Sequence, residues 1–361
     1  MNMFLAWKEI KHAKGRYALI TGVIFLIAFL VFFLSGLAYG LAQEGRMAVD
    51  NWKANAVILT KDANDNLSAS QFDKEDINGV TAKEKATLLQ GASVIQVKND
   101  SDKKDNIMMF GINKDQFLAP KISKGEMFQN NKEVVIDESL AKQKGFAIGD
   151  KVLFTGYDTP MKVVGMTKGN MFNMAPTVYM SEKAFQNVRQ TPVPMQKNVN
   201  AIIVRAKDGN LDNVKVKNKK LEVIPMKEFI DHLPGYKAQV MTFSFMIGFL
   251  ILIAAIVVGI FIYVLTMQKK QIFGVMKVQG IPTSFIAKSV VMQTFILGVI
   301  GVVIGFVATI GVSLLLPAAV PFQLNVPLMI VIAILMIIIA VLGSIFSVRS
   351  IAKIDPLQAL N

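Results

Sequence analysis

The chain alternates long uncharged apolar runs with polar segments, and this pattern predicts four membrane-spanning helices. The runs cover residues 17–43, 238–268, 289–316 and 328–348. A helix needs about 20 apolar residues to cross the hydrocarbon core of a bilayer, so each run is long enough. Prolines fall between the last two runs, and because proline interrupts a helix we predict a short loop at 317–327.

The segment between the first two runs, residues 44–237, is polar and predicts a separate folded domain. It carries 29 Lys or Arg against 24 Asp or Glu. Short runs rich in β-branched and aromatic residues recur along it, as is typical of strands. Helical patterns at 138–145 and 181–188 lie between some of these runs, so we predict an α+β domain. The predicted strands cover 56–59, 93–97, 107–112, 134–136, 151–154, 161–166, 177–180 and 201–204.

Basic residues at the ends of the apolar runs predict the side of the membrane that each segment occupies. Lys or Arg residues lie beside the runs in the N-terminal segment 1–16, the loop 269–288 and the tail 349–361. Because loops rich in Lys and Arg stay in the cytoplasm, both termini and this loop are predicted to be cytoplasmic. The domain at 44–237 and the loop at 317–327 are then extracellular. The first run is longer than the apolar part of a signal peptide, about 7 to 15 residues.

The composition is that of a cell-membrane protein and excludes several kinds of site. Of the 361 residues 53% are hydrophobic, and the net charge is +13. The lack of cysteine excludes disulfides, thiolate catalysis and cysteine-ligated metals, and two histidines leave little for a metal cluster. The positive charge is spread over the polar domain and the flanks of the runs, which does not favour nucleic-acid binding.

Several motifs of energy coupling are missing from the sequence, which argues against an enzyme or a self-powered pump. No GxxxxGK[ST] phosphate loop occurs, so the chain does not bind ATP by that motif. The apolar runs contain no charged residue or histidine away from their ends, so an ion-coupled pathway has no groups to use. The energy for any transport is therefore expected from another subunit, and no cofactor is predicted.

The cytoplasmic stretch 263–289 carries the pattern of a short amphipathic helix. Ile272, Val275, Met276 and Gln279 recur at three- and four-residue spacing, and the Gly-Ile-Pro at 280–282 ends the pattern. Four lysines and no acid accompany it. From the charges alone, a docking surface and a solvated loop that only sets the topology remain equally good interpretations.

Two stretches make the chain resemble the FtsX/MacB-type permeases of ABC transporters. They are QKKQIFGVMKVQGI at 268–281 and KIDPLQAL at 353–360, in a chain with one span, a large outer domain and three more spans. The resemblance implies that two permeases assemble with two separate ATPase subunits and transmit their closure through the spans. It favours docking of the cytoplasmic loop on the ATPase, and the residues that we expect there are Lys269, Lys270, Ile272, Phe273, Val275, Met276 and Lys277.

Further stretches resemble the HrtB-type haem-efflux permeases of Gram-positive bacteria. They are FLAWKEIKHAKGRYALI at 4–20, FFLSGLAYGLAQE at 32–44 and FIYVLTMQKKQIFGVMKVQGI at 261–281. This resemblance implies a homodimer that takes haem from the outer part of the lipid bilayer and exports it. Haem is then a transported substrate and not a cofactor.

The chain has side chains suited to haem near the outer ends of its first two spans. Haem iron accepts Tyr and Met ligands, and the macrocycle needs an apolar or aromatic slot. Each candidate also has a plain structural interpretation, such as an aromatic residue at the headgroup level. The segment 169–174 adds two methionines, although Phe172 stands where some relatives have Tyr. The candidates are Tyr39, Glu44, Met47, Phe172, Tyr236 and Met241.

Two other functions fit the same architecture. A permease of this kind could move another amphiphile, such as an antimicrobial peptide, a macrolide or a lipoprotein, through the same slot without an iron ligand. It could also resemble FtsX itself and activate a cell-wall hydrolase, with no transported substrate. Against the second alternative, the outer domain at 44–237 is larger than expected for FtsX.

Overall fold

The computed structural model of the chain describes residues 14–317 and 319–352 in two compact units. We call residues 1–40 and 241–361 the helical unit and residues 41–240 the inserted domain. Most of the predicted cytoplasmic segment 1–16, most of the stretch 4–20 and the KIDPLQAL motif at 353–360 lie outside the described residues. The predicted fold class is confirmed, since an α+β domain is inserted after the first of four apolar helices.

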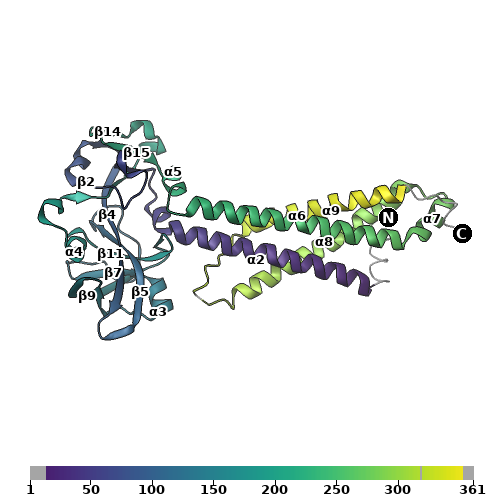
Figure 1. Cartoon of the computed structure of the whole chain (residues 1–361), viewed down its shortest axis with the longest axis horizontal. Coiled ribbons are helices and arrows are strands. Elements are labelled where there is room, and N and C mark those ends of the chain that lie inside the picture. Colours follow the sequence, from purple (N-terminus) through teal and green to yellow (C-terminus); the bar gives the residue numbers. More distant parts are fainter. Residues whose placement is uncertain (1–13, 318, 353–361) are drawn as a thin grey trace. The chain divides into compact units, whose positions relative to one another are not determined.

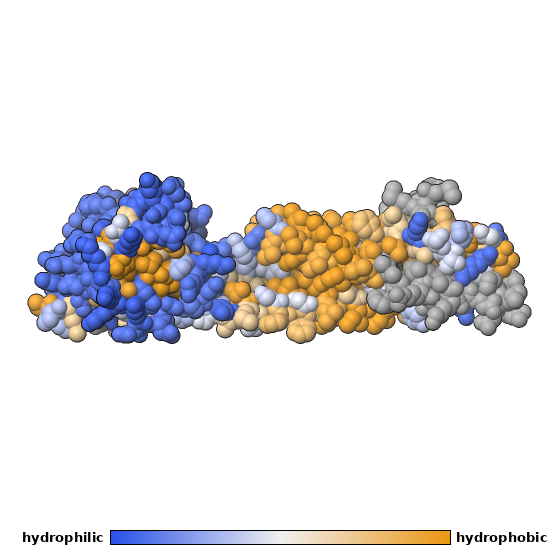
Figure 2. Space-filling model, turned by 90° about the horizontal axis from the view of Figure 1, so that it is seen from above, coloured by the Kyte–Doolittle hydropathy of each residue, from blue (hydrophilic) through white to orange (hydrophobic). Residues whose placement is uncertain are grey.

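Four helices in the described ranges are long and apolar enough to cross a membrane, so the chain is a multi-pass membrane protein. Figure 2 shows an apolar surface over the helical unit and a mainly hydrophilic surface over the inserted domain. The short helix predicted in the cytoplasmic loop is confirmed as α7. The bounds of the four long helices and of the short helix α7 are α2 (Lys14–Trp52), α6 (Tyr236–Gln268), α7 (Lys270–Val278), α8 (Thr283–Ser313) and α9 (Val326–Ala352).

All four long helices extend past the predicted spans, α6 and α9 by a few residues and α2 and α8 by more. Helix α2 continues beyond residue 43 to Trp52, because Ala48, Val49 and Trp52 recur at helical spacing and pack into the core of the inserted domain. Helix α8 begins at Thr283 rather than at 289, directly after Pro282. A proline just before the first turn is favourable. The first N–H groups of a helix have no partner within the helix, and proline has no N–H that would need one. The membrane boundaries and the side of each loop remain predictions.

Glycines allow α8 to approach α2 closely within the helical unit. A Cβ atom on Gly305 would lie 2.9 Å from the backbone nitrogen of Phe29 and from Cβ of Ala28. A Cβ atom on Gly301 would lie 2.7 Å from Cγ2 of Ile24. Small residues at this spacing are how membrane helices gain van der Waals contact.

Gly36 and Gly40 form a GxxxG pair, a spacing that suggests close contact with another helix. Their contacts are with a loop instead. A Cβ atom on Gly36 would overlap the ring of Phe322, and one on Gly40 would overlap the backbone of Pro321. The backbone nitrogen of Gln323 also donates to the Gly36 oxygen at 3.1 Å. These two glycines therefore seat the loop between α8 and α9 rather than another helix.

The inserted domain is built on one eleven-stranded mixed sheet, with two additional two-stranded sheets (Figure 1). All eight predicted strand segments are confirmed, but the sequence pattern missed β2, β3, β6, β10, β12, β14 and β15 and the first parts of β4, β5 and β9. The strands are β1 (Ala56–Thr60), β2 (Phe72–Asp73), β3 (Val80–Thr81), β4 (Glu84–Val97), β5 (Asp100–Ile112), β6 (Ile122–Gly125), β7 (Glu133–Asp137), β8 (Lys151–Phe154), β9 (Tyr157–Thr167), β10 (Met171–Phe172), β11 (Ala175–Ser181), β12 (Asn198–Val199), β13 (Ala201–Arg205), β14 (Lys215–Val216) and β15 (Leu221–Pro225).

Six strands of the large sheet close on themselves. The pairings run from β4 through β5, β11, β7, β9 and β8 and back to β4. Side chains such as Ile95, Val163 and Val178 fill a fully buried core. The first half of β4 leaves this ring and pairs with β13, beside β1 and β15. Strand β4 therefore joins a closed barrel to an open sheet.

Short helices follow three strands of the inserted domain, and both predicted helices are confirmed. Helix α3 (Glu138–Lys144) is capped by the Asp137 carboxylate, which accepts from the Ser139 nitrogen at 2.9 Å. Helix α4 (Glu182–Val188) is capped by Ser181, which accepts from the Ala184 nitrogen at 3.1 Å. Helix α5 (Met226–Asp231) precedes α6.

Candidate functional site

The last turns of α2 hold one group of the predicted haem residues. Glu44 and Met47 are three residues apart and so share a face of the helix. Both side chains are half-buried in the inserted domain. Within the described part of the chain, the Glu44 carboxylate makes no hydrogen bond and no ion pair. A carboxylate without a hydrogen-bond partner in the described chain and a thioether that packs beside Gly169 thus share one face of α2.

Tyr236, at the start of α6, lies against the same turns of α2. Its hydroxyl oxygen accepts a hydrogen bond from Nη1 of Arg46 at 3.2 Å. The other side of the Arg46 guanidinium donates to Asp50, with distances of 2.8 and 2.7 Å. The Tyr236 ring packs on Gly45, where an added Cβ atom would be 3.6 Å from ring carbon Cδ2. Arg46 therefore fixes the phenol oxygen on the face of α2 opposite to Glu44 and Met47.

The hairpin of β10 and β11 is hydrogen-bonded to this part of α2. Its two turn residues, Asn173 and Met174, have φ angles of 54° and 63°, as in the type I′ turns of two-residue hairpins. The Asn173 nitrogen donates to the Gly45 oxygen at 2.9 Å, and the Met174 nitrogen donates to the Glu44 oxygen at 3.3 Å. The hairpin tip is thus held beside Glu44, and the Met174 side chain is 43% exposed.

Asn170 is the buried hub that fixes this hairpin. Its nitrogen donates to the Asp137 carboxylate at 2.7 Å, and its side-chain oxygen accepts from the Tyr179 hydroxyl at 2.8 Å and from Asn51 Nδ2 at 3.2 Å. Asn51 lies on α2, so the hub links α2 to the barrel. Burial raises the pKa of Tyr179, and the charge of Asp137 adds to the effect. Tyr179 therefore stays a neutral donor.

Replacing Asn170 by alanine is expected to destabilise the inserted domain by about 2 to 3 kcal/mol, because buried polar groups of Asp137 and Tyr179 lose a partner. Thermal unfolding of the full-length protein in detergent, followed by tryptophan fluorescence, to which the buried Trp52 contributes, measures this. Asn210→Ala, at an exposed turn, is the control with a small expected effect. Equal unfolding midpoints for Asn170→Ala and wild type would show that the hub is not needed.

Phe172 does not lie at a surface, so the prediction that it stacks on a ligand is not supported. It is 3% exposed and packs edge-on against Phe110, with ring centroids 5.4 Å apart. The register of β10 turns it into the core of the domain, where Tyr179 also contacts Phe110. The side chain of this segment that reaches the surface is Met174.

The other two predicted residues, Tyr39 and Met241, belong to the helical unit. Tyr39 is half-buried on α2, and Met241 is 49% exposed on α6.

Arg46 and Asp50 were not predicted as site residues, although their four-residue spacing on one helix is a sequence signal for an ion pair. The link between Asn51 and Asn170 spans 119 positions and has no such signal.

The residues predicted to contact an ATPase divide between two sides of α7. Phe273 is buried and Met276 is half-buried, and both pack on the core of the helical unit. Ile272 and Val275 are 58% and 41% exposed. Lys270 is exposed and Lys277 is half-buried. Fewer residues of α7 are therefore exposed than were predicted to contact the ATPase.

Lys269 and Phe273 attach α7 to the transmembrane helices. The Lys269 ammonium donates to the Tyr17 hydroxyl at 2.9 Å, and Gln293 Nε2 donates to the same oxygen at 2.6 Å. Tyr17 lies on α2 and Gln293 on α8, so this contact joins three helices at one end of the unit. The Lys269 ammonium is accordingly directed into the helical unit.

Two family models match the chain. The model of the FtsX-like permease C-terminal region matches residues 244–356, and that of the MacB-like periplasmic core domain matches residues 18–217. Among solved structures, the extracellular domain of the ABC-type transporter YknZ from Gram-positive bacteria is 16% identical, with a TM-score of 0.30 over 46% of this chain and 84% of that one. The periplasmic region of MacB from Actinobacillus actinomycetemcomitans is 14% identical, with a TM-score of 0.36 over 48% of this chain and 89% of that one.

Several proteins are similar over almost the whole length. The putative hemin transport system permease protein HrtB of Staphylococcus epidermidis is 31% identical over 99% of both chains. The protein with the same description from Staphylococcus haemolyticus is 28% identical over 99% of both. An uncharacterised ABC transporter permease of Mycobacterium tuberculosis is 22% identical, again over 99% of both.

Proposed function

Because this chain belongs to the family of FtsX-like ABC transporter permeases, we propose that it is the permease subunit of a haem exporter. The observation that carries this proposal is the 31% identity, over 99% of both chains, with a permease described as part of a hemin transport system. The direction of transport, from the membrane to the outside, is part of the proposal. A separate ATPase supplies the energy.

In the proposed assembly two copies of the permease pair with two ATPase subunits. The exposed side of α7, with Ile272 and Val275, meets the ATPase. Its buried side transmits the movement, since Phe273 is packed in the core of the helical unit and Lys269 is bonded to Tyr17 of α2. A push on α7 is thereby passed to the helix that also carries Glu44 and Met47.

The proposed haem site lies at the last turns of α2. Tyr236 is a side chain of a type that binds haem iron. Met47 and Glu44 lie on the other face of α2, away from Gly45 and Arg46, and are a second set of candidate groups. The guanidinium of Arg46 is occupied on one side by Asp50, so its role is to hold the Tyr236 oxygen in place. Haem enters this site as the transported substrate.

Tyr236→Phe is expected to weaken haemin binding about tenfold, which is about 1.4 kcal/mol, because a hydrogen-bonded oxygen ligand is removed. Arg46→Gln is expected to weaken binding in the same direction, since the oxygen loses its donor. Absorbance titration with haemin in detergent measures both. Tyr157→Phe, on β9 away from these residues, is the control. Unchanged affinity in Tyr236→Phe and Arg46→Gln would remove this site from the proposal.

A further inference from the structure

One edge of strand β4 is unpaired where the strand passes from the open sheet to the barrel. On this edge β4 pairs with β13 up to Leu88 and with β8 only from Ile95 onward. Its other edge pairs continuously with β5, and no register shift occurs before Gln96. Between the two pairings the Gln90 nitrogen donates to Asn200 Oδ1 at 2.8 Å, so the unpaired part of this edge lies around Ala92.

Hydrogen bonds show which backbone groups face this gap. The Leu88 oxygen accepts from the Asn200 nitrogen at 2.9 Å, and the Val94 oxygen accepts from the Thr155 nitrogen at 3.1 Å. Backbone groups of alternate residues point to the same edge of a strand, so the N–H and C=O of Ala92 point there as well. Ala92 is exposed, and within the described chain no strand pairs with it on this edge.

A cavity of about 480 Å³ adjoins the gap, a volume within the range of ligand sites. Ala92, Met109 and Val188 contribute apolar surface. Arg189 is the one charged residue among the residues that line it. Its guanidinium has no hydrogen bond or ion pair with any residue of the described chain. The cavity therefore combines an unpaired strand edge, apolar walls and an uncompensated positive charge.

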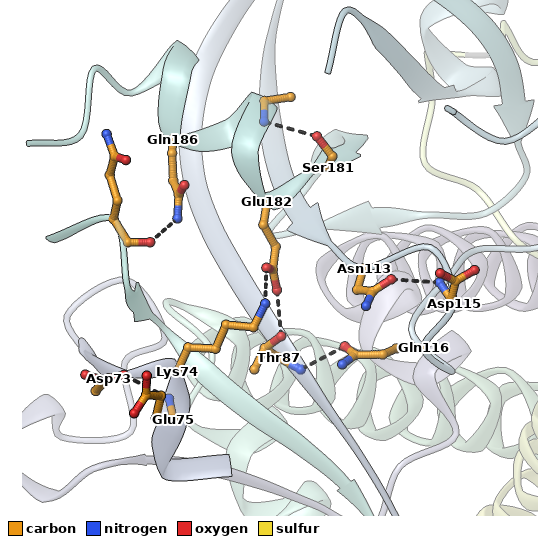
Figure 3. A network of polar contacts seen from close by, with 12 residues as sticks. Asp73, Lys74, Glu75, Thr87, Asn113, Asp115, Gln116, Ser181, Glu182 and Gln186 are labelled. Carbon is orange, nitrogen blue, oxygen red and sulfur yellow. Dashed lines mark hydrogen bonds and ion pairs between the residues drawn. The ribbon is translucent and has the colours of Figure 1, made fainter. Parts of the chain in front are cut away.

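The end of α4 that carries Arg189 is held in place. Figure 3 shows the Glu182 carboxylate between the Lys74 ammonium and the Thr87 hydroxyl, which donates at 2.6 Å, so the first turn of α4 is bonded to β4. At the other end the Arg189 nitrogen donates to the Phe185 oxygen at 2.9 Å, and Arg189 Nε would lie 3.7 Å from a Cβ atom on Gly91. The backbone that carries the exposed Arg189 side chain is thus held beside the strand.

We propose that this cavity binds the carboxyl terminus of an extended peptide. The peptide backbone pairs with the N–H and C=O of Ala92 as an added strand, and its terminal carboxylate accepts hydrogen bonds from Arg189. Strand addition supplies main-chain hydrogen bonds, and a guanidinium recognises a carboxylate through two parallel ones. The cavity holds one cation and no acid among its lining residues, so its charge complements a single carboxylate. This binding is separate from haem transport.

The probe is a pool of fluorescein-labelled pentapeptides randomised at four positions, made with either a free carboxyl terminus or a carboxamide. Fluorescence anisotropy with the full-length permease in detergent measures binding up to millimolar peptide. The free acids are expected to bind saturably and at least tenfold more tightly than the amides, because only they pair with Arg189. Equal binding of acids and amides, or no saturable binding of either, would overturn the proposal.

Two variants separate the contributions of charge and strand. Arg189→Gln is expected to remove the difference between acid and amide, while Lys183→Gln, on the same helix but outside this cavity, keeps it. Ala92→Pro removes the free N–H and is therefore expected to weaken the binding of both peptide forms. The strand itself tolerates proline here, because the N–H of Ala92 faces an open edge. Thermal unfolding of each variant in detergent checks that the protein is folded. An unchanged preference for acids in Arg189→Gln would contradict the assignment of the carboxylate.

Discussion

Aspartate in place of Val275 is expected to lower the ATP hydrolysis of the assembled transporter at least tenfold. Val275 and Ile272 are exposed on α7 while Phe273 beneath them is buried. A charge at the centre of an apolar contact must be desolvated without a partner, which costs several kcal/mol. Because Val275 is 41% exposed in the free permease, its replacement leaves the permease itself folded.

The measurement is the ATPase rate of the transporter reconstituted from the permease and its ATPase, with co-elution in size-exclusion chromatography. Gln279→Asp is the matched control, since it adds the same charge to an exposed polar position just past the end of α7. The control is expected to keep most of the activity. If Val275→Asp hydrolysed ATP and co-eluted like wild type, α7 would not be the docking surface.

Leucine in place of Gly305 is expected to prevent the native packing of α2 against α8. Even a Cβ atom would lie 2.9 Å from the Phe29 nitrogen and from Cβ of Ala28, and backbone atoms cannot rotate away. The three further carbons of leucine force the helices apart, with a cost above the roughly 1 to 3 kcal/mol of ordinary overpacking. The neighbouring contact of Phe32 with Phe306, now 5.6 Å between ring centroids, would be lost as well.

Thermal unfolding and size-exclusion profiles of the detergent-purified protein measure this effect. Gly311→Leu is the control on the same helix, because nothing lies within 4 Å of an added Cβ atom there. It is expected to behave like wild type, since its side chain would face the surface of α8. A Gly305→Leu protein as stable as Gly311→Leu would show that α2 and α8 do not pack at this glycine.

Most of the fold could be predicted from the sequence because its signals are local. The spans follow from uncharged runs, and the strands of the inserted domain from short β-rich runs. The extension of α2 to Trp52 was missed because Glu44 and Arg46 end the apolar run. The helix continues there because one face of it still packs on a core, the core of the inserted domain.

The candidate site was less predictable, because its geometry depends on contacts between distant positions. Phe172 has an aromatic ring of the kind that stacks on ligands. Only the register of the hairpin β10–β11 reveals that this ring points inward. The glycine pair at 36 and 40 indicates a close contact but not that a loop fills it. Similarly, the pattern of α7 identifies a helix but does not separate its buried residue Phe273 from its exposed residue Val275.

Titration of the purified wild-type protein with haemin, followed through the Soret band, shows whether this permease binds haem as its substrate. A saturable shift at one haem or fewer per chain, stronger than the binding of metal-free protoporphyrin, is expected if Tyr236 is the oxygen ligand of the iron. A non-saturating signal equal to that of empty detergent micelles would contradict haem binding, and would favour transport of another amphiphile or activation of a cell-wall hydrolase by the same permease fold.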